Sequence, residues 1–449
     1  MTLDDRTFRK ALYAQLELSP LEPSDPRYLQ PVAEEHDVVE RLRGTIDISR
    51  QSVQLLSGYR GTGKSTELRR LRRDLVQEGH FVALIDIEEH LDLNTPVDIV
   101  DFLLGVAGAL GDALRDESML GADPLVESVW GRFSKWLGSE VRLNEVGLDA
   151  EGVVLKAELK ANPTFRQLIQ QHVANSIGRF AAEVRGFVGE CVLALRKRHG
   201  GDASLVLIVD SIEHARGTTA NEADIFAGVE RLFGQHDDKL RLPDVHVIYT
   251  VPPWLRVRRP NIGSLYDGEG LYVIPAHKVR ERGTGDAPGA VYTAGVDHLR
   301  ALVHKRGGPG DIDRLLGDAE NLDRIILQTG GHLRDLMRAL VSVMLRARTL
   351  PATREVVDSA LAALREQLLP IPLDDARWLA KIARSRSAEL AGLDALGDLT
   401  RYFEGHLVLS YRNGEAWYDV HPLVRDHVLE LARRAESEAS EASGSGDVG

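Results

Sequence analysis

Short apolar runs alternate with helical patterns between residues 52 and 274. Ser52–Leu56 and Phe81–Ile87 are apolar runs of strand length, and Thr66–Glu78 between them has the spacing of a helix. Further apolar runs stand at Leu205–Val209, Val245–Tyr249 and Leu271–Ile274. Strands that are joined through helices pair side by side in one direction, so the pattern predicts an α/β domain with a parallel sheet.

Helical patterns fill much of the remaining chain. An insertion at 97–200 is predicted to be largely helical, although its middle, 140–160, alternates apolar and polar residues as a small hairpin does. No function is assigned to that hairpin. From 291 to 369, helical patterns follow one another without an intervening strand. The sequence therefore predicts a helical insertion within the sheet domain and a helical lid after it.

A compact unit is predicted after the break at Pro370-Ile371-Pro372. Its helical segments are Asp374–Ser385 and Leu393–Phe403, and its strands are His406–Tyr411 and Glu415–Val420. Asn413-Gly414 joins the strands and is a strong hairpin signal, because both central positions of a type I′ turn need a positive φ. Two helices followed by a hairpin are typical of a winged helix. The tail at 435–449 is rich in Glu, Ser, Ala and Gly and is predicted to be disordered.

A glycine-rich octapeptide lies between the first strand and the helix that follows it. It reads Gly58-Tyr59-Arg60-Gly61-Thr62-Gly63-Lys64-Ser65, which matches the Walker A pattern, and Thr66 comes next. Glycines let the backbone curl so that its N–H groups and the positive end of the helix face phosphate oxygens. Lys64 is expected to bridge the β- and γ-phosphates, and the Ser65 hydroxyl is expected to ligate Mg²⁺. Residues 58–66 are therefore predicted to form a nucleotide-binding P-loop.

Two carboxylates follow the strand at 205–209. Asp210 ends that strand as a Walker B acid and is expected to hold Mg²⁺ together with Ser65. Glu213 is the nearest carboxylate that could polarise the attacking water, because Ser211 occupies the position after the metal-binding acid. The structural alternatives are a helix cap for Asp210 and a solvated helix residue for Glu213.

Two further polar residues are candidates for sensing the γ-phosphate. Thr250 closes the strand at 245–249, where its hydroxyl could hydrogen-bond the γ-phosphate or the lytic water. Arg334 stands near the start of a lid helix and could reach back to the nucleotide. The alternatives are a residue that begins the Pro252-Pro253 turn for Thr250 and a surface ion pair for Arg334.

The base of the nucleotide is predicted from an absence in the sequence. No Asn-Lys-x-Asp element, which would read guanine, follows any late strand, so adenine is favoured. In ATPases of this kind the segment ahead of the first strand, which is 25–31 here, often walls the adenine. The expected cofactors are ATP or ADP with Mg²⁺.

Composition and charge indicate the class of protein, its possible partners and its compartment. The chain has 449 residues, of which 43% are apolar and 27% are charged, as in a soluble globular protein. Its formal charge of −13 disfavours polyanions as partners unless they meet a local basic patch. Cys191 is the one cysteine, so a reducing compartment is expected. Residues 1–6 lack a secretion signal and no apolar run approaches the about 18–20 residues of a membrane span, so a cytoplasmic protein without membrane contact is expected.

In the order of its parts, the chain resembles the AAA+-like STAND ATPases, which are switches related to NACHT and plant resistance proteins; origin-recognition ATPases have a similar architecture. The resemblance covers Pro26 to Glu430. Val420-His421-Pro422, directly after the wing, looks like the Met-His-Asp motif of those switches, with Pro422 in the place of the usual Asp. Gly331-His332-Leu333 resembles their Gly-x-Pro element, with Leu333 in the place of Pro. The resemblance implies that His421 contacts the β-phosphate of bound ADP.

These observations predict a P-loop NTPase sheet of the ASCE or AAA+-like kind with a helical insertion, a helical lid and a C-terminal winged helix. The predicted divisions are an N-terminal segment (1–30), a P-loop ATPase domain (31–290) with its insertion (97–200), a lid (291–369), a winged helix (370–434) and a disordered tail (435–449).

The function expected from this organisation is that of an ATP-hydrolysing switch. The resemblance implies self-association and control of a protein effector in trans, in bacterial signalling or antiphage defence. Arg256, Arg258 and Arg259 are candidates for an arginine that completes a neighbouring subunit's site. One alternative is a DNA-binding initiator, which is disfavoured because the predicted recognition helix carries more acidic than basic residues. A second alternative is a nucleotide-binding scaffold with little turnover.

Overall fold

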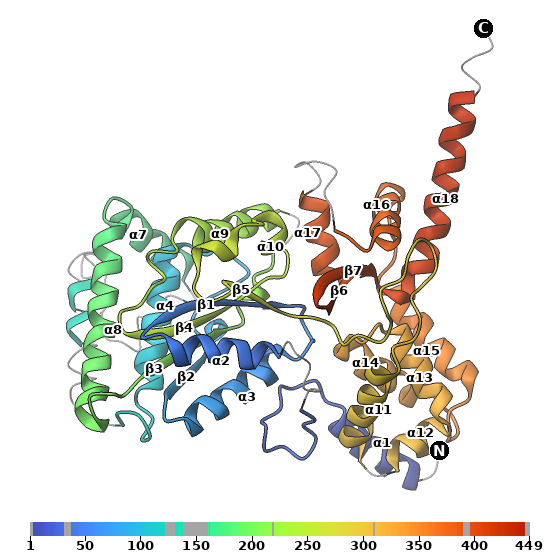
Figure 1. Cartoon of the computed structure of the whole chain (residues 1–449), viewed down its shortest axis with the longest axis horizontal. Helices are drawn as coiled ribbons and strands as arrows, with labels where there is room; N and C mark the ends of the chain where they lie inside the picture. Colours follow the sequence, from blue (N-terminus) through green and yellow to red (C-terminus); the bar gives the residue numbers. More distant parts are fainter. Residues whose placement is uncertain are drawn as a thin grey trace. The chain divides into compact units, whose positions relative to one another are not determined.

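The computed structural model describes residues 3–30, 37–121, 131–133, 135–137, 160, 162–217, 220–308, 310–388 and 396–444 (Figure 1). They belong to two compact units. Unit 1 comprises Met1–His36, Gly58–Thr66 and Ile274–Gly449, and unit 2 comprises Asp37–Ser57 and Glu67–Val273. Residues 58–66, the predicted P-loop, thus group with the lid and winged-helix segments, whereas the sequence assigns them to the same domain as the sheet.

Unit 2 is built on a five-stranded sheet. Its strands are β1 (Ser52–Gly58), β2 (Phe81–Asp86), β3 (Leu205–Asp210), β4 (Val245–Val251) and β5 (Leu271–Ile274). They lie in the order β2-β3-β4-β1-β5, and the pairs β1/β4, β3/β4 and β2/β3 are parallel. The predicted α/β fold with a parallel sheet is confirmed, and the strand that ends in Asp210 is separated from the strand that ends in Gly58 by β4.

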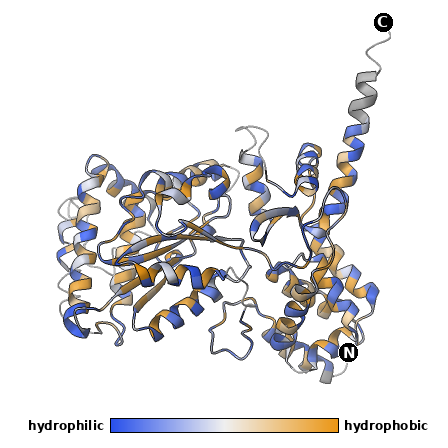
Figure 2. Ribbon diagram, in the orientation of Figure 1, coloured by the Kyte–Doolittle hydropathy of each residue, from blue (hydrophilic) through white to orange (hydrophobic). Residues whose placement is uncertain are grey.

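Helices cover both faces of the sheet. The helices of this unit are α2 (Val38–Ile48), α3 (Lys64–Gln77), α4 (Ile99–Ala113), α7 (Pro163–Val173), α8 (Ile177–His199), α9 (Glu222–Gln235) and α10 (Leu255–Arg258), with short 3-10 turns η1 (Ile87–Glu89), η3 (Ile212–His214) and η4 (Ile262–Leu265). On one face, Gln54 of β1 donates to the carbonyl of Leu42 in α2. On the other face, Tyr249 of β4 packs against Phe102 of α4 and Phe233 of α9. A sheet that is covered on both faces explains why its strands are mostly apolar in sequence, and Figure 2 shows much orange along them.

The described residues of the insertion within unit 2 are largely helical, as predicted. α4, α7 and α8 all fall within or begin next to it, and Asp101 of α4 accepts a hydrogen bond of 2.6 Å from Gln170 of α7. The predicted hairpin at 140–160 lies outside the described residues, apart from residue 160.

The lid in unit 1 is a bundle of helices. They are α1 (Leu3–Gln15), α11 (Thr293–Gly307), α12 (Asp311–Leu316), α13 (Ala319–Gln328), α14 (Leu333–Arg346) and α15 (Arg354–Glu366). α1 was not predicted, yet Phe8, Leu12 and Leu16 are buried in the same apolar cluster as α11 to α15. Arg9 adds hydrogen bonds to the carbonyl oxygens of Met344 and Ala347, at the end of α14. The N-terminal segment is therefore a structural part of the lid.

The winged helix is also present in unit 1. It consists of α16 (Leu373–Ser385), α17 (Leu396–Glu404), β6 (Val408–Asn413), β7 (Glu415–Val420) and α18 (Pro422–Gly444). β6 and β7 pair antiparallel with Asn413 opposite Glu415, so Gly414 alone forms the tip, at φ 72°. The hairpin is confirmed, but its turn is not the type I′ turn that Asn413-Gly414 indicates. α18 continues to Gly444, whereas the sequence predicts disorder from residue 435.

None of the helices in the described parts of the chain is long and apolar enough to cross a membrane.

The burial of α1 in the lid core generates a stability prediction. Leu12 is 0% exposed, so Leu12→Ala is expected to lower the free energy of unfolding by about 2–5 kcal/mol, because it leaves a cavity. Tyr13, the next residue, is 56% exposed, and Tyr13→Ala is expected to change that free energy by about 0.5 kcal/mol or less. Urea denaturation followed by circular dichroism measures both. Equal losses for the two variants would contradict the assignment of α1 to the lid core.

Candidate functional site

The loop between β1 and α3 is tightly curled. β1 ends at Gly58 and α3 begins at Lys64, so the residues between them turn the chain from strand to helix. Gly61 and Gly63 have φ values of 91° and 99°, which strain any residue that has a Cβ. The Thr62 amide and hydroxyl both donate to the carbonyl of Tyr59, at 3.3 and 2.9 Å. The two inner glycines of the motif are thus required by the backbone itself.

The Lys64 side chain crosses this loop. Its Nζ donates to the carbonyl oxygens of Gly58 at 2.9 Å and Tyr59 at 3.2 Å, and only 4% of the residue is exposed. Ser65 and Thr66 lie in the first turn of α3. The Thr66 hydroxyl accepts a hydrogen bond of 3.2 Å from the amide of Leu21, in the N-terminal segment. The loop therefore holds the ammonium group close to its own backbone, beside the positive end of a helix.

The start of lid helix α14 lies against the loop. The Arg334 amide donates to the carbonyl of Gly61 at 3.2 Å, and His332 Nε2 donates to the carbonyl of Arg60 at 2.9 Å. A Cβ added to Gly61 would be 2.4 Å from the Cβ of Arg334, which is too close for two carbon atoms. Arg334, predicted from the sequence as a residue of the site, thus contacts the P-loop directly. His332 was not predicted as a site residue. Its position after Gly331, directly before a lid helix, is the feature of the sequence that could have indicated it.

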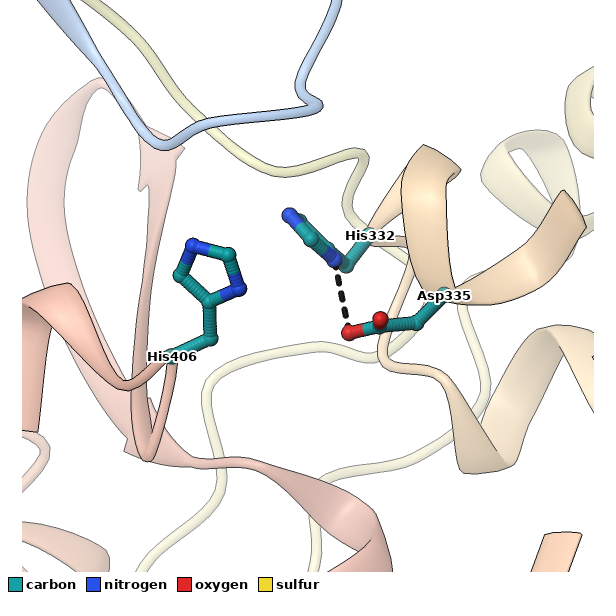
Figure 3. Close-up of side chains that lie close together, drawn as sticks. All are labelled: His332, Asp335 and His406. Atoms are coloured by element: carbon teal, nitrogen blue, oxygen red, sulfur yellow. Dashed lines mark hydrogen bonds and ion pairs between the residues drawn. The ribbon is translucent and has the colours of Figure 1, made fainter. Parts of the chain in front are cut away.

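A buried carboxylate joins His332 to the winged helix. Asp335 Oδ2 lies 2.7 Å from His332 Nδ1 and 3.3 Å from His421 Nε2 (Figure 3 shows the first contact). Burial would raise the pKa of Asp335, but hydrogen bonds from His332 and His421 outweigh it and hold that pKa below its usual range. Burial lowers the pKa of His421, and its Nδ1 accepts a hydrogen bond of 3.2 Å from the Leu423 amide, so the neutral ring carries its proton on Nε2. His421 therefore reaches the P-loop through Asp335 and His332, whereas the resemblance implies a direct contact with a phosphate.

The winged helix also contacts the P-loop itself. The Tyr59 ring stacks on Phe403 of α17, with ring centroids 5.7 Å apart and planes 5° apart, and meets the edge of His406 at 6.1 Å. The Tyr411 hydroxyl of β6 donates to the carbonyl of Gly330 at 2.7 Å. Tyr59 is only 1% exposed. Three parts of unit 1, the loop, the lid and the winged helix, are therefore in mutual contact.

The predicted acids and sensor lie together in unit 2. Asp210 ends β3, and Ser211 follows it in a left-handed conformation at φ 77°. This turn brings the Ile212 amide to Thr250 Oγ1, at 3.3 Å, so the ends of β3 and β4 are joined by a hydrogen bond. Glu213 lies in η3 and is 7% exposed, which excludes the alternative of a solvated helix residue. Asp210, Glu213 and Thr250 thus gather at the carboxyl ends of two adjacent strands, where open α/β sheets bind their ligands.

The residues fit the cofactors that the sequence implies. Gly61 and Gly63 keep the loop free of Cβ atoms at its two left-handed positions, and Lys64 supplies a buried cation beside it. The hydroxyl of Ser65 and the carboxylate of Asp210 are oxygen ligands, which Mg²⁺ prefers. Each unit thus holds donors that suit a nucleoside triphosphate or its Mg²⁺: the loop and Ser65 in unit 1, and Asp210 in unit 2.

Comparisons with known proteins give likenesses in fold. No family model and no curated protein matches the sequence. The solved structures that resemble it include the Walker-type ATPase PABY2304 of Pyrococcus abyssi, at 13% identity and a TM-score of 0.42, with 93% of this chain and 99% of that chain covered. The ORC2 protein of Aeropyrum pernix, in ADPNP–ADP complexes, has 13% identity and a TM-score of 0.37, with 92% and 97% covered. Cdc6p of Pyrobaculum aerophilum has 12% identity and a TM-score of 0.36, with 95% and 98% covered. Identities and TM-scores this low carry no inference about ligand or activity.

The contact between Gly61 and the lid generates a prediction about nucleotide binding. Gly61→Ala is expected to weaken binding of a fluorescent ADP analogue roughly ten-fold or more, because the added methyl group forces Arg334 and the loop apart. Gly79→Ala is the matched control, because Gly79 has a similar φ of 94° but no atom within 4 Å of the place that an added methyl group would take. The control should keep its affinity for the analogue. Equal affinity of Gly61→Ala and Gly79→Ala for the analogue would contradict the prediction, because it would mean that the contact between Gly61 and Arg334 does not matter for binding.

Proposed function

We propose that this chain is an ATP-binding and ATP-hydrolysing switch of the AAA+-like, P-loop kind. The single observation that carries the proposal is the placement of the Walker A loop. It connects the end of β1 to the start of α3, in a sheet whose neighbouring strands deliver Asp210 and Thr250 at their carboxyl ends. The loop supplies main-chain donors and a lysine for a triphosphate, and the strand that ends in Asp210 supplies the acid that the Walker B pattern predicts for its metal.

Each residue has a proposed task in the reaction. Lys64 holds the β- and γ-phosphate oxygens, while Ser65 and Asp210 hold Mg²⁺, which would neutralise charge on the phosphates. Glu213 would take a proton from the attacking water; it lies in η3, directly after β3, with 7% of the residue exposed. Thr250 Oγ1 already accepts from the Ile212 amide, so its own proton is available to donate to the γ-phosphate or the water.

The contacts within unit 1 support a switch. A ligand shifts a conformational equilibrium only by its differential affinity for the two states, so the moving parts must interact with the ligand's own binding loop. Here Arg334 and His332 of the lid bond to loop carbonyl oxygens, and Phe403 of the winged helix stacks on Tyr59. We propose that the γ-phosphate changes the loop and that the lid and winged helix respond.

The output of the switch is proposed by family resemblance. It comprises self-association in the ATP state and control of a separate effector protein, in bacterial signalling or antiphage defence. Arg256 and Arg259 are the better candidates to complete a neighbouring site, because both are exposed. Arg258 is half-buried and lies 2.9 Å from Glu230, whereas Arg259 lies 4.0 Å from the same carboxylate.

The DNA-binding alternative gains no support from α17, the predicted recognition helix. Arg401, the basic residue of α17, lies 2.9 Å from Asp375 and 3.1 Å from Asp398, so its charge is already matched by carboxylates. Phosphate backbones are recognised by unmatched basic side chains. The other alternative, a nucleotide-binding scaffold with little turnover, is distinguished from an ATPase by the rate of ATP hydrolysis.

ATP hydrolysis is tested by substituting the proposed site. Lys64→Ala and Asp210→Asn are expected to lower kcat roughly 10²–10³-fold, because each removes charge stabilisation of the transferring phosphate. Glu213→Gln is expected to lower it roughly 10²–10⁴-fold through loss of the base. Asp224→Asn, which changes an exposed acid of α9, is the control and should hydrolyse ATP at the wild-type rate. A wild-type rate no higher than that of Lys64→Ala would contradict the proposal of an ATPase and would favour the nucleotide-binding scaffold.

The switch is tested by measuring the size of the protein in two nucleotide states. With a non-hydrolysable ATP analogue, light scattering coupled to size exclusion is expected to give a larger mass than with ADP. Arg256→Ala and Arg259→Ala together are expected to reduce that increase. Identical masses and identical small-angle scattering profiles in the two nucleotides would count against a conformational switch.

A further inference from the structure

Two histidines and an aspartate form a compact cluster in unit 1. His332 precedes α14, Asp335 lies in its first turn, and His406 comes from the turn between α17 and β6 (Figure 3). Each offers one ligand atom, and these atoms all lie within 4.8 Å of one another. The cluster joins the lid to the winged helix at the place where His332 holds the P-loop.

The hydrogen bonds fix the protonation of His332. The Arg60 carbonyl has no proton to give, so His332 Nε2 must donate to it, and the neutral ring then has a lone pair on Nδ1. That lone pair faces the Asp335 carboxylate oxygen at 2.7 Å. When a second proton on Nδ1 makes the ring an imidazolium, this contact is the hydrogen bond described above. In a neutral ring the two lone pairs at this distance repel unless another positive charge lies between or beside them. A proton or a metal ion can supply that charge.

The surroundings of the cluster have the form of a metal site. A histidine that binds a metal usually donates its other ring N–H to a carbonyl or carboxylate, and a carboxylate that binds a metal is itself hydrogen-bonded. His332 donates to the carbonyl of Arg60 in this way. Asp335 Oδ2 faces the protonated Nε2 of His421 at 3.3 Å, and His421 is oriented in turn by the Leu423 amide. Both residues are therefore already oriented from outside the cluster.

His406 completes the set with a third donor. Its ring centroid lies 4.7 Å from that of His332, and no hydrogen bond to its ring nitrogens is found in the described part of the chain. A neutral imidazole ring has a lone pair to offer to a metal ion. Its backbone is left-handed, at φ 57°, which points to a fixed and specific placement.

We propose that His332, Asp335 and His406 form a Zn²⁺ site that fastens the winged helix to the lid. Two imidazoles and one carboxylate suit Zn²⁺ better than Mg²⁺ or Ca²⁺, which take oxygen ligands. Three protein ligands leave the fourth position of a tetrahedral ion to water. Because His332 also donates to the Arg60 carbonyl, the bound ion would stabilise the contact between the lid and the P-loop. A more tightly held P-loop is expected to slow ATP turnover, and this consequence rests on the proposed function.

The experiment titrates Zn²⁺ into the untagged full-length chain after removal of metals with a chelator, without nucleotide. Calorimetry gives stoichiometry and affinity, and Co²⁺ in place of Zn²⁺ gives a visible absorption that reports tetrahedral coordination. His406→Asn is the test variant, because asparagine also tolerates the left-handed backbone but lacks the imidazole. His80→Ala is the control for the exposed group Asp47, Glu78 and His80, which is the other described cluster of metal-ligating residues. Equal melting temperatures in chelator show that the variants are folded.

Wild type and His80→Ala are expected to bind one Zn²⁺ with equal affinity and to melt at a higher temperature with the metal. His406→Asn is expected to lose about 100-fold or more in affinity, together with the tetrahedral Co²⁺ spectrum. Lys64→Ala should keep full Zn²⁺ binding, so failure of ATP hydrolysis and failure of the metal site are separate results. Absence of saturable binding to wild type, or binding that survives His406→Asn but not His80→Ala, would overturn the proposal.

Discussion

Hydrogen bonds to the carbonyl oxygens of the P-loop are the constraint on which the rest of unit 1 depends. Arg60 and Gly61 present their carbonyl groups to the lid, where His332 and the Arg334 amide donate to them. A peptide unit has its N–H and C=O on opposite sides, so fixing the carbonyl also fixes the direction of the next amide. The lid therefore helps to set the conformation of the loop that is proposed to bind phosphates. The same bonds give the loop a means of moving the lid.

Asp335 extends this constraint to the winged helix. Its carboxylate lies between His332 and His421, all three are buried, and hydrogen bonds hold its pKa low despite burial. Separating Asp335 from the two histidines would leave a buried charge without its partners. Loss of one member of a buried ion pair typically lowers the free energy of unfolding by about 3–5 kcal/mol. The winged helix and the lid thus cannot separate here without new partners for the carboxylate. The two parts therefore separate only when another interaction stabilises the separated conformation.

The sequence predicts those features that depend on local pattern. Apolar runs locate the strands, and the spacing of Gly58, Gly63 and Lys64 locates the P-loop, because strand burial and loop curvature are properties of neighbouring residues. α1 escapes prediction although Phe8, Leu12 and Leu16 have helical spacing, since nothing nearby in the chain indicates the lid core that they join. The helical extension of α18 to Gly444 escapes prediction because its polar composition is also typical of disorder.

The part of the site that depends on distant residues could not be predicted. His332 and Arg60 are far apart in sequence, and only the fold brings them within 2.9 Å. His421 is recognisable by its place after the wing, but its partner, Asp335, comes from the lid, so its contact could not be derived from the motif. The tasks of Lys64, Asp210 and Glu213 remain predictions from the motif, supported by the burial of all three residues.

Hydrogen–deuterium exchange of the full chain with and without a non-hydrolysable ATP analogue tests the central claim most directly. The account predicts slower exchange in the P-loop, residues 58–66, and a simultaneous change in the lid peptide 330–336 and the winged-helix peptide 402–411, because both contact that loop. Slower exchange in the P-loop alone, with both other peptides unchanged, would contradict a switch that is read by lid and winged helix. No change in the P-loop would contradict nucleotide binding there.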